Sequence, residues 1–291
     1  MEATAPKEGK PVSQTTPLTE ALPRPRQVPQ LRRRIVVLNQ KGGAGKTTTA
    51  VTLAAIWAEA GYRVRLIDAD PQLGGSTLWL LGQQAMTEDD ELPPGLKTLL
   101  GVFLDKHGLN DAAIEVRPNL WLVPSDGTLK EVENKRPAGA ELALVQGIVE
   151  SDQDVIDIID CPPNLGVLAV AGLLAGQDLV IPVRASGLDL PAMRELNGTL
   201  ATVRKRLNPE LRTSAVLVTD AHNNLLTEKT FNRLRQDYPE TTVMKIRHSV
   251  RASEAPTVAE PLTDYAADAT TTADYRRLAN HLLPGSVATR G

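Results

Sequence analysis

The 291-residue sequence contains a single cysteine, Cys161, which excludes an intramolecular disulfide and argues against a zinc site built from several cysteines. Aromatic residues make up only 3% of the chain, so base-stacking platforms for single-stranded nucleic acid are not expected. No apolar run reaches the roughly 20 residues of a membrane-spanning helix, and the first residues lack the apolar core of a signal peptide. We therefore expect a cytoplasmic protein that does not bind membranes.

The chain also lacks a strong net charge. The formal charge of −3 provides no overall basic field, so any contact with nucleic acid must come from a local patch. In contrast, the hydrophobic content of 42% is sufficient for a sizeable core. These properties fit a globular protein of one or two domains.

The first part of the chain, residues 1–33, is rich in proline and polar residues. We predict a disordered tail, because such a segment buries too little apolar surface to offset the entropy lost on ordering. Its end is basic, with Arg24, Arg26, Arg32, Arg33 and Arg34. This cluster is either part of a solvated linker or part of a flexible arm that contacts DNA phosphates or a partner protein. Residues 34–283 are expected to form one domain, and residues 284–291 a flexible end.

After the tail, short apolar runs alternate with longer helical stretches. This pattern is typical of an α/β fold with a mostly parallel, twisted sheet and helices on both faces. The apolar runs are continuous, as expected of strands that are covered on both sides. The predicted strands are residues 35–38, 64–67, 120–123, 155–159, 179–183, 215–218 and 243–246. The predicted helices include residues 46–60, 96–104, 186–207 and 273–283, and residues 84–94 are expected to form a loop.

A glycine-rich turn follows the first predicted strand and leads into a helix. Backbone N–H groups of such a turn, together with the positive end of the helix dipole, form a cradle for phosphate. Lys46 then supplies a positive charge to the phosphates, and Thr47 supplies a hydroxyl ligand for Mg²⁺. The predicted nucleotide-binding residues are Gly42, Gly43, Ala44, Gly45, Lys46, Thr47 and Thr48. The alternative, a glycine turn with two solvated lysines, explains less of the pattern.

Carboxylates stand at the ends of two other predicted strands. Asp68 and Asp70 follow the second strand and, being two residues apart, leave an extended chain on the same face. Asp160 directly follows the strand predicted at residues 155–159. Because ligands bind at the carboxyl ends of strands in open α/β sheets, we predict that these acids share one Mg²⁺–phosphate site. Asp157 lies three residues before Asp160 and is expected to be a surface or strand-start acid.

These motifs resemble those of the ParA/MinD family of P-loop ATPases. Residues 41–47, Lys-Gly-Gly-Ala-Gly-Lys-Thr, match its deviant Walker A motif, in which a second lysine stands near the start of the loop. Residues 68–72 resemble the D-x-D-P-Q segment, and residues 155–163 resemble the Walker B segment. Residues 247–256 resemble the ParA segment R-x-x-V-R-x-S-E-A-P, which is less typical of MinD. Residues 73–77 depart from the usual continuation, which affects only the expected switch contacts.

The resemblance implies a P-loop NTPase-like fold and a ParA-type DNA-partitioning ATPase. Such an enzyme hydrolyses ATP to ADP and phosphate with Mg²⁺ and forms a homodimer when it binds ATP. By the match of motifs, Lys41 reaches the phosphates of the partner protomer, Asp70 acts on the hydrolytic water, and Asp68 and Asp160 support the metal beside Thr47. The ATP-bound dimer binds double-stranded DNA non-specifically on the nucleoid, and a ParB-like centromere-binding protein stimulates hydrolysis.

The same resemblance assigns base and DNA contacts to the last third of the chain. It implies that Asp220 and Pro256 lie near the adenine. It also implies that Arg251, with Arg247 beside it, contacts DNA phosphates, although a pair of solvated arginines is the simpler alternative. His222 stands where relatives carry a DNA-contacting arginine. DNA affinity at this position is then expected either to be weaker or to come from neighbouring residues: Lys229, Arg233 and Arg235.

Three other functions compete with this interpretation. A ParA-like ATPase that positions a protein cargo through its N-terminal tail is the main alternative, because the tail is basic and predicted to be disordered. A membrane-bound division regulator is disfavoured, since residues 273–283 lack the basic amphipathic stripe of a surface-bound helix. A reductase with a bridging iron–sulfur cluster is disfavoured because one cysteine supplies too few ligands.

Overall fold

The computed structural model describes residues 33–286 except for 73–74, 88–90, 152–153 and 187–189. Its described strands form one sheet in the order β3-β4-β2-β5-β1-β6-β7-β8. All neighbours pair in parallel except β3 and β4. The strands are β1 (Arg33–Val37), β2 (Val64–Asp68), β3 (Ile114–Arg117), β4 (Leu120–Val123), β5 (Ile156–Asp160), β6 (Asp178–Arg184), β7 (Arg212–Ala221) and β8 (Thr242–Arg247).

The seven predicted strands are confirmed, and β3 is an addition. It is only four residues long, lies at the sheet edge, and pairs antiparallel with β4. Its sequence, Ile-Glu-Val-Arg, alternates apolar and charged residues, and only its first residue is buried. Such a short edge strand lacks the continuous apolar run that marks the other strands.

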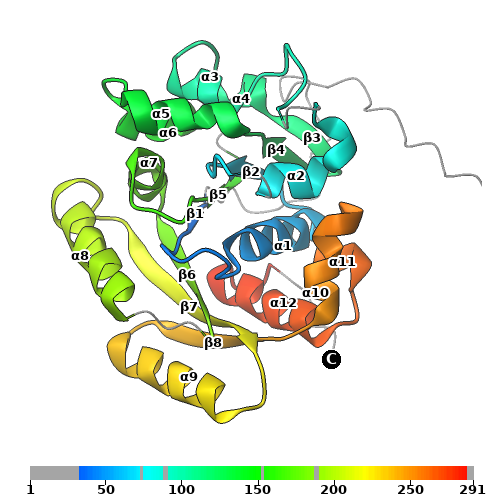
Figure 1. Ribbon diagram of the computed structural model, residues 1–291, viewed down its shortest axis with the longest axis vertical. Coiled ribbons are helices and arrows are strands. Elements are labelled where there is room, and N and C mark those ends of the chain that lie inside the picture. The colour runs from blue at the N-terminus through cyan, green and yellow to red at the C-terminus, as the bar shows by residue number, and fades with distance from the viewer. Residues whose placement is uncertain (1–32, 73–74, 88–90, 152–153, 187–189, 287–291) are drawn as a thin grey trace, which may run out of the picture.

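Helices cover both faces of the sheet (Figure 1). The helices are α1 (Lys46–Glu59), α2 (Ser76–Leu81), α3 (Leu99–Phe103), α4 (Leu109–Ala112), α5 (Lys130–Lys135), α6 (Ala143–Glu150), α7 (Val167–Ala175), α8 (Leu190–Arg206), α9 (Leu225–Asp237), α10 (Val250–Glu254), α11 (Leu262–Tyr265) and α12 (Thr270–Leu282). The helix predicted at residues 96–104 is shorter than expected, whereas those at 46–60, 186–207 and 273–283 correspond to α1, α8 and α12. Part of the loop predicted at residues 84–94 lies outside the described residues. In the part of the chain that is described, no helix is long and apolar enough to cross a membrane.

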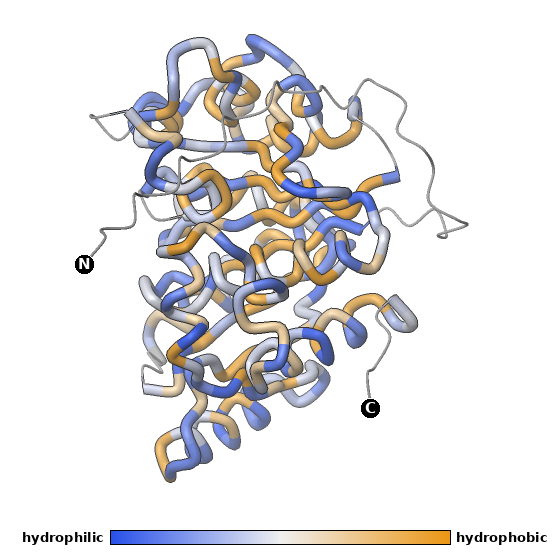
Figure 2. Tube along the Cα trace, turned by 90° about the vertical axis from the view of Figure 1, so that its right-hand side faces the viewer, coloured by the Kyte–Doolittle hydropathy of each residue, from blue (hydrophilic) through white to orange (hydrophobic). Residues whose placement is uncertain are grey.

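Two hydrophobic cores lie on opposite faces of the sheet. Along β1, Ile35 and Val37 join the core beneath α1, α11 and α12, whereas Val36 joins the core beneath α3–α9. Successive side chains of a strand point to opposite faces, so a strand covered on both sides must be apolar throughout. Figure 2 shows the result as hydrophobic strands within a more hydrophilic exterior.

Helix α7 approaches the central strands closely. A Cβ atom at Gly172 would lie 2.7 Å from the Sγ atom of Cys161, and one at Gly176 would lie 2.2 Å from a methyl group of Val36. Cys161 follows β5 directly and is fully buried. Because neither glycine leaves room for a side chain, the backbone of α7 packs tightly on β1 and β5 and encloses the thiol.

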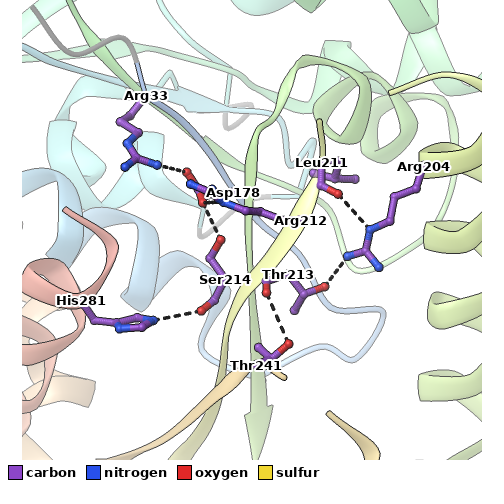
Figure 3. A network of polar contacts seen from close by, with 9 residues as sticks. All are labelled: Arg33, Asp178, Arg204, Leu211, Arg212, Thr213, Ser214, Thr241 and His281. Atoms are coloured by element: carbon purple, nitrogen blue, oxygen red, sulfur yellow. Dashed lines mark hydrogen bonds and ion pairs between the residues drawn. The ribbon is translucent and has the colours of Figure 1, made fainter. Parts of the chain in front are cut away.

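At the amino ends of the strands, a buried carboxylate joins β1, β6 and β7. Asp178 accepts hydrogen bonds from Arg33 at 2.9 Å and Arg212 at 2.7 Å, and a third from the hydroxyl of Ser214 (Figure 3). Burial opposes ionisation, but the hydrogen bonds from Arg212 and Ser214 hold the pKa of Asp178 below its ordinary value. The buried acid therefore remains charged and cross-links the strands.

Two arginines of the predicted basic tail are thus part of the fold. Arg33 lies in β1 and pairs with Asp178, and Arg34 lies 3.6 Å from Glu210. The other three lie outside the described residues, as does the rest of the tail. Near the end of the described chain, the hydroxyl of Ser286 accepts a hydrogen bond from the indole of Trp57 at 3.2 Å. Packing onto the domain therefore extends to residue 286.

Of the two alternatives expected for Asp157, the surface acid is wrong, whereas its position near the start of β5 agrees with the strand-start acid. Asp157 is within β5 and 1% exposed, and its Oδ1 lies 2.7 Å from the Nε of Arg65, which is fully buried. Arg65 also donates to Asn110 at 2.6 Å and to Ser151 at 2.8 Å. A buried ion pair is stable only when its remaining polar atoms are also bonded, and these extra partners meet that need.

Candidate functional site

The turn between β1 and α1 has the backbone geometry expected of the predicted phosphate cradle. Gly43 and Gly45 have φ angles of 69° and 86°, which are readily accessible only to glycine. Gly45 is the N-cap of α1, and within the described residues no side chain caps the helix start. The first N–H groups of α1 thus remain available to an anion, which is the usual arrangement at a phosphate-binding helix N-terminus.

Several loops converge on a cavity of about 300 Å³ in front of this turn, which we call the phosphate cavity. The lining residues are Gly42, Gly43, Gly45, Lys46, Thr47, Thr48, Asp70, Gln72, Gly75 and Pro163. The structure therefore brings the predicted glycine loop, the Asp70 segment and the Pro163 loop to one place. Ala44 is buried behind the turn, where its carbonyl accepts a hydrogen bond from the hydroxyl of Thr219 at 2.9 Å.

Asp68 and Asp160 lie directly opposite each other at the ends of β2 and β5. Both are buried. Asp68 Oδ2 accepts a hydrogen bond from the backbone N–H of Thr77 at 2.7 Å, and Asp160 Oδ2 accepts one from the hydroxyl of Ser76 at 2.8 Å. Among the described residues, Asp160 Oδ1 has no hydrogen-bond partner although it is buried. A buried carboxylate oxygen without a partner is costly unless a ligand supplies one.

The electrostatics of this acid pair favour a cation. Burial raises the pKa of Asp68, and the nearby charge of Asp160 raises it further. Burial also raises the pKa of Asp160, whereas the hydrogen bond from Ser76 and the nearby hydroxyl of Thr47 act in the opposite direction. A divalent cation bound by oxygen atoms would remove both the like-charge repulsion and the unpaired oxygen. The set of oxygen donors formed by Thr47, Asp160 and Asp68 fits Mg²⁺.

Asp70 lies where it can reach ligands in the phosphate cavity. It is 8% exposed, and its Oδ1 accepts a hydrogen bond from the backbone N–H of Gln72 at 3.0 Å. Burial raises its pKa, although the Gln72 hydrogen bond and the charge of Lys46 lower it. A raised pKa at a cavity-facing carboxylate is typical of a group that exchanges protons.

Lys41 is exposed at the start of the glycine turn, whereas Lys46 is buried. The backbone N–H of Lys41 donates to the side chain of Asn39 at 3.2 Å, and Asn39 in turn donates to the carbonyl of Pro182 at 2.6 Å. These bonds anchor the beginning of the turn to β6. The two lysines therefore differ in position, one within the cradle and one at its outer side.

A second cavity of about 340 Å³, here named the β7–β8 cavity, adjoins the same turn. Its lining residues are Gly43, Gly45, Thr48, Arg184, Thr219, Asp220, Ile246, Arg247, His248, Ser249, Ala252, Ser253, Thr271 and Tyr275. Asp220, predicted near the adenine, is among them. Pro256, also predicted there, lies in the short turn η4 (Ala255–Val258) outside this lining set.

The predicted DNA-binding residues lie on α9, α10 and the end of β8, and in the described part of the chain Arg233, Arg247 and Arg251 form ion pairs. Arg247 binds the buried Asp274 through two nitrogens, at 2.8 and 2.6 Å. Arg251 binds Asp268 at 2.7 Å, and Arg233 binds Asp237 at 2.8 Å. Lys229 is exposed. DNA contact by these arginines remains a prediction, and it requires them to share or exchange their present partners.

One group of residues in this region was only partly anticipated from the sequence. The side chains of Asp220, His222 and His248 gather at the carboxyl ends of β7 and β8. Asp220 and His222 had each been noted, but His248 had not. The only available signal was that all three residues follow or end predicted strands.

Comparisons with known proteins agree with this geometry. Residues 32–213 match the protein family described as an AAA domain. The chain is 34% identical to the chromosome-partitioning ATPase Soj of Thermus thermophilus over 257 residues, which covers 86% of this chain and 95% of that protein. It is 32% identical to the chromosome partitioning protein ParA of Caulobacter vibrioides over 258 residues, covering 86% and 93%.

A solved structure is also similar. The cobyrinic acid a,c-diamide synthase of Mycobacterium smegmatis, crystallised with ADP and magnesium, is 28% identical with a TM-score of 0.71, covering 87% of this chain and 94% of that one. The glycine turn, the acid pair of Asp68 and Asp160, and the family match all indicate the same family. This chain belongs to the ParA-type family of P-loop ATPases.

Proposed function

We propose that this chain is a DNA-partitioning ATPase whose ATP- and Mg²⁺-bound state is a dimer that holds non-specific DNA. The observation that supports it best is the buried oxygen of Asp160 that has no hydrogen-bond partner among the described residues and lies near Lys46 and Thr47 of the phosphate cavity. The partitioning role follows from the named relatives, and the nucleotide and metal from the cavity and from the ligands of the similar structure.

In the proposed reaction, the protein positions ATP and a water molecule and compensates charge. Lys46 and the N–H groups of residues 42–48 hold the phosphates, while Thr47 and Asp160, supported by Asp68, hold the metal. Bound Mg²⁺ supplies positive charge that offsets the charge developing on the phosphate oxygens. Asp70 orients the attacking water and accepts its proton, a role that its raised pKa supports.

Lys41 is assigned to the dimer. Its exposure outside the cradle leaves it accessible to the phosphates of a second protomer, whereas Lys46 is buried in its own. A lysine that crosses the interface links dimer lifetime to hydrolysis, because its attraction weakens once phosphate leaves. Light scattering with ATP tests this: Lys41→Ala should remain monomeric while still binding ATP, and an ATP-dependent dimer of this variant would contradict the assignment.

DNA binding is tested with random-sequence duplex DNA in the presence of ATP, ADP or no nucleotide, over a salt series. We expect binding only with ATP, and an affinity that falls steeply with salt because phosphate contacts release counterions. Arg251→Glu should abolish binding while ATP binding persists. Lys135→Glu is the matched control, since it reverses an exposed charge on α5, distant from α9 and α10 (Figure 1).

The same DNA-binding experiment distinguishes DNA partitioning from the alternative function. Arg233, Arg247 and Arg251 already form ion pairs with carboxylates. Fewer positive charges are therefore available to DNA phosphates than the sequence alone predicts. Absence of DNA binding in every nucleotide state, with dimerisation intact, would favour positioning of a protein cargo through the N-terminal tail. If DNA binding is confirmed, a ParB-like centromere-binding partner is expected to stimulate slow turnover, measured as phosphate release with and without that partner.

A further inference from the structure

Asp220, His222 and His248 converge outside the phosphate cavity. Asp220 lies in β7 near its carboxyl end, His222 follows the strand, and His248 follows β8. One ligand atom from each residue lies within 4.8 Å of the other two. We propose that these three residues form a binding site for a borderline divalent cation of the Zn²⁺ type, distinct from the Mg²⁺ site at Asp160.

Two of the three distances between donor atoms are close to those around such an ion. His222 Nε2 lies 3.5 Å from Asp220 Oδ1, and His248 Nδ1 lies 2.7 Å from the same oxygen. Tetrahedral coordination with bonds of about 2.0–2.1 Å separates neighbouring donor atoms by roughly 3.3 Å. The first distance already matches. The second is a hydrogen bond that lengthens by roughly 0.6 Å when the ion replaces its proton.

The backbone holds two of the three ligands, Asp220 and His248, in place. Asp220 has a φ angle of 53°, a conformation that a residue with a side chain seldom adopts, and the β7–β8 register shifts between Val218 and Ala221. Immediately beyond this irregularity, the backbone N–H of His248 donates to the carbonyl of Ala221 at 3.0 Å. The irregularity orients Asp220 and the hydrogen bond fixes His248 beside it, so both ligands are positioned by strands.

The carboxylate is also oriented from behind. Arg184 binds Asp220 Oδ2 at 2.9 Å, which leaves Oδ1 for the two imidazoles. A ligand carboxylate that is itself hydrogen-bonded by another residue is common in metal sites, where it fixes ligand orientation.

The donor set indicates the class of metal. Two imidazole nitrogens and one carboxylate oxygen are typical ligands of Zn²⁺ and neighbouring transition metals, whereas Mg²⁺ and Ca²⁺ prefer oxygen alone. The imidazole rings are stacked, with centroids 4.2 Å apart and an interplanar angle of 25°, so at least one ring must rotate before the in-plane lone pairs of both point at one ion. Three protein ligands leave a fourth position open to water or to another ligand.

The proposed cation site lies beside the glycine turn. Asp220 and His248 line the β7–β8 cavity together with Gly43, Gly45 and Thr48 of the glycine turn. A bound cation would therefore add positive charge to the wall of a cavity that adjoins the phosphate cradle. This placement does not depend on the proposed partitioning function, because the metal site requires only the three side chains.

The test uses the full chain, treated with a chelator and kept free of nucleotide and Mg²⁺. Competition with a chromophoric zinc chelator should reveal one bound equivalent, and Co²⁺ substitution should give visible absorption bands of a nitrogen- and oxygen-ligated ion. His222→Ala and His248→Ala should each weaken binding of the ion by about tenfold to a hundredfold or more. Loss of a residue that only hydrogen-bonds to a metal ligand already costs about that much affinity.

The chain provides matched controls, because its four histidines are His107, His222, His248 and His281, and only two belong to the cluster. His107→Ala and His281→Ala should bind the ion as the unaltered chain does. Thermal unfolding without metal checks that every variant is folded, and Asp220→Asn provides a second ligand deletion of nearly unchanged shape. Equal affinity in the His222→Ala/His248→Ala double variant, or no bound equivalent in the unaltered chain, would overturn the proposal.

Discussion

The two ends of β5 carry two buried aspartates with opposite electrostatic surroundings. Asp157, near the amino end, lies against the guanidinium of Arg65, whose other nitrogens bind Asn110 and Ser151. Asp160, at the carboxyl end, lies opposite another acid, Asp68, and one of its oxygens has no partner among the described residues. Three residues along one strand thus separate a compensated charge from an uncompensated one.

This difference distinguishes a structural acid from a functional one. Leaving a buried charge unpaired costs free energy, so such a group persists in a fold only where something else is gained. At the amino ends, Asp157 and Asp178 are paired with arginines and hold strands together. At the carboxyl ends, Asp68 and Asp160 are available to a ligand. Burial alone does not separate the two kinds, whereas their partners do.

The strongest way to break this comparison is to remove the charge of Asp157. In Asp157→Asn the guanidinium of Arg65 remains buried without its anion, and we expect a loss of about 3–5 kcal/mol in the free energy of unfolding. Urea denaturation measures it. The double variant Arg65→Met/Asp157→Leu should recover most of the loss, because it removes both charges. A loss below about 1 kcal/mol in the single variant would mean that the pair contributes little.

The equivalent substitution at the carboxyl end of β5 should reduce ATP turnover strongly and should not reduce stability. Asp160→Asn keeps the shape but loses the metal ligand, so we expect ATP turnover to fall about 100- to 1,000-fold. The free energy of unfolding should stay level or rise, since a charge facing Asp68 is gone. Phosphate release and urea denaturation on the same preparation provide both values. A large loss of stability would show that Asp160 is structural after all.

The pH dependence of stability sharpens the comparison further. When unfolded, Asp68 and Asp160 titrate near 3.8, and folding raises both pKa values. Between about pH 4 and the raised values, the folded state therefore binds more protons than the unfolded state. The contribution of the pair to stability falls as pH rises, by at most about 1.4 kcal/mol per pH unit for each proton.

This effect is measured as the difference between the unaltered chain and Asp160→Asn, without Mg²⁺ or nucleotide, from pH 5 to about pH 8. The difference should change with pH in the direction stated, and adding Mg²⁺ with ATP should reduce the slope because bound cations favour the ionised acids. Parallel curves for the two proteins would contradict the raised pKa values.

The smallest effect is expected at Asp178. In Arg33→Ala this acid retains Arg212 and Ser214, so we expect a loss of about 1 kcal/mol or less. Thermal or urea unfolding measures it, with Arg34→Ala as the neighbouring control, because the ion pair of Arg34 is with the exposed Glu210 and is longer, at 3.6 Å. A loss as large as that of Asp157→Asn would show that Asp178 also depends on a single partner.

Much of this architecture was predictable from the sequence because its signals are local. The continuous apolar runs identified seven strands, since a strand between two helical layers must be apolar on both sides. The glycine turn and the acids at strand ends identified the phosphate cavity, because backbone freedom and strand position are encoded within a few residues. Asp70, Lys46 and Thr47 indeed line one cavity.

What escaped prediction depends on contacts between distant parts of the chain. Arg65 and Asp157 are 92 residues apart, and nothing near Asp157 in sequence shows that an arginine of β2 lies beside it. His248 approaches Asp220 only because β7 and β8 are neighbours with a local irregularity. The carboxylates that hold Arg247 and Arg251 come from α12 and the segment before it. Partners of charged side chains are a property of the fold.

The enclosure of Cys161 beneath α7 makes the chain convenient for thiol chemistry. Burial, with the nearby charge of Asp160, raises the pKa of this thiol far above its ordinary value, so it stays protonated and shielded from alkylating reagents. One cysteine introduced on the surface would then be the only reactive position for a fluorescent label. In the unaltered chain, slow alkylation of Cys161 would time the openings that separate α7 from the central strands.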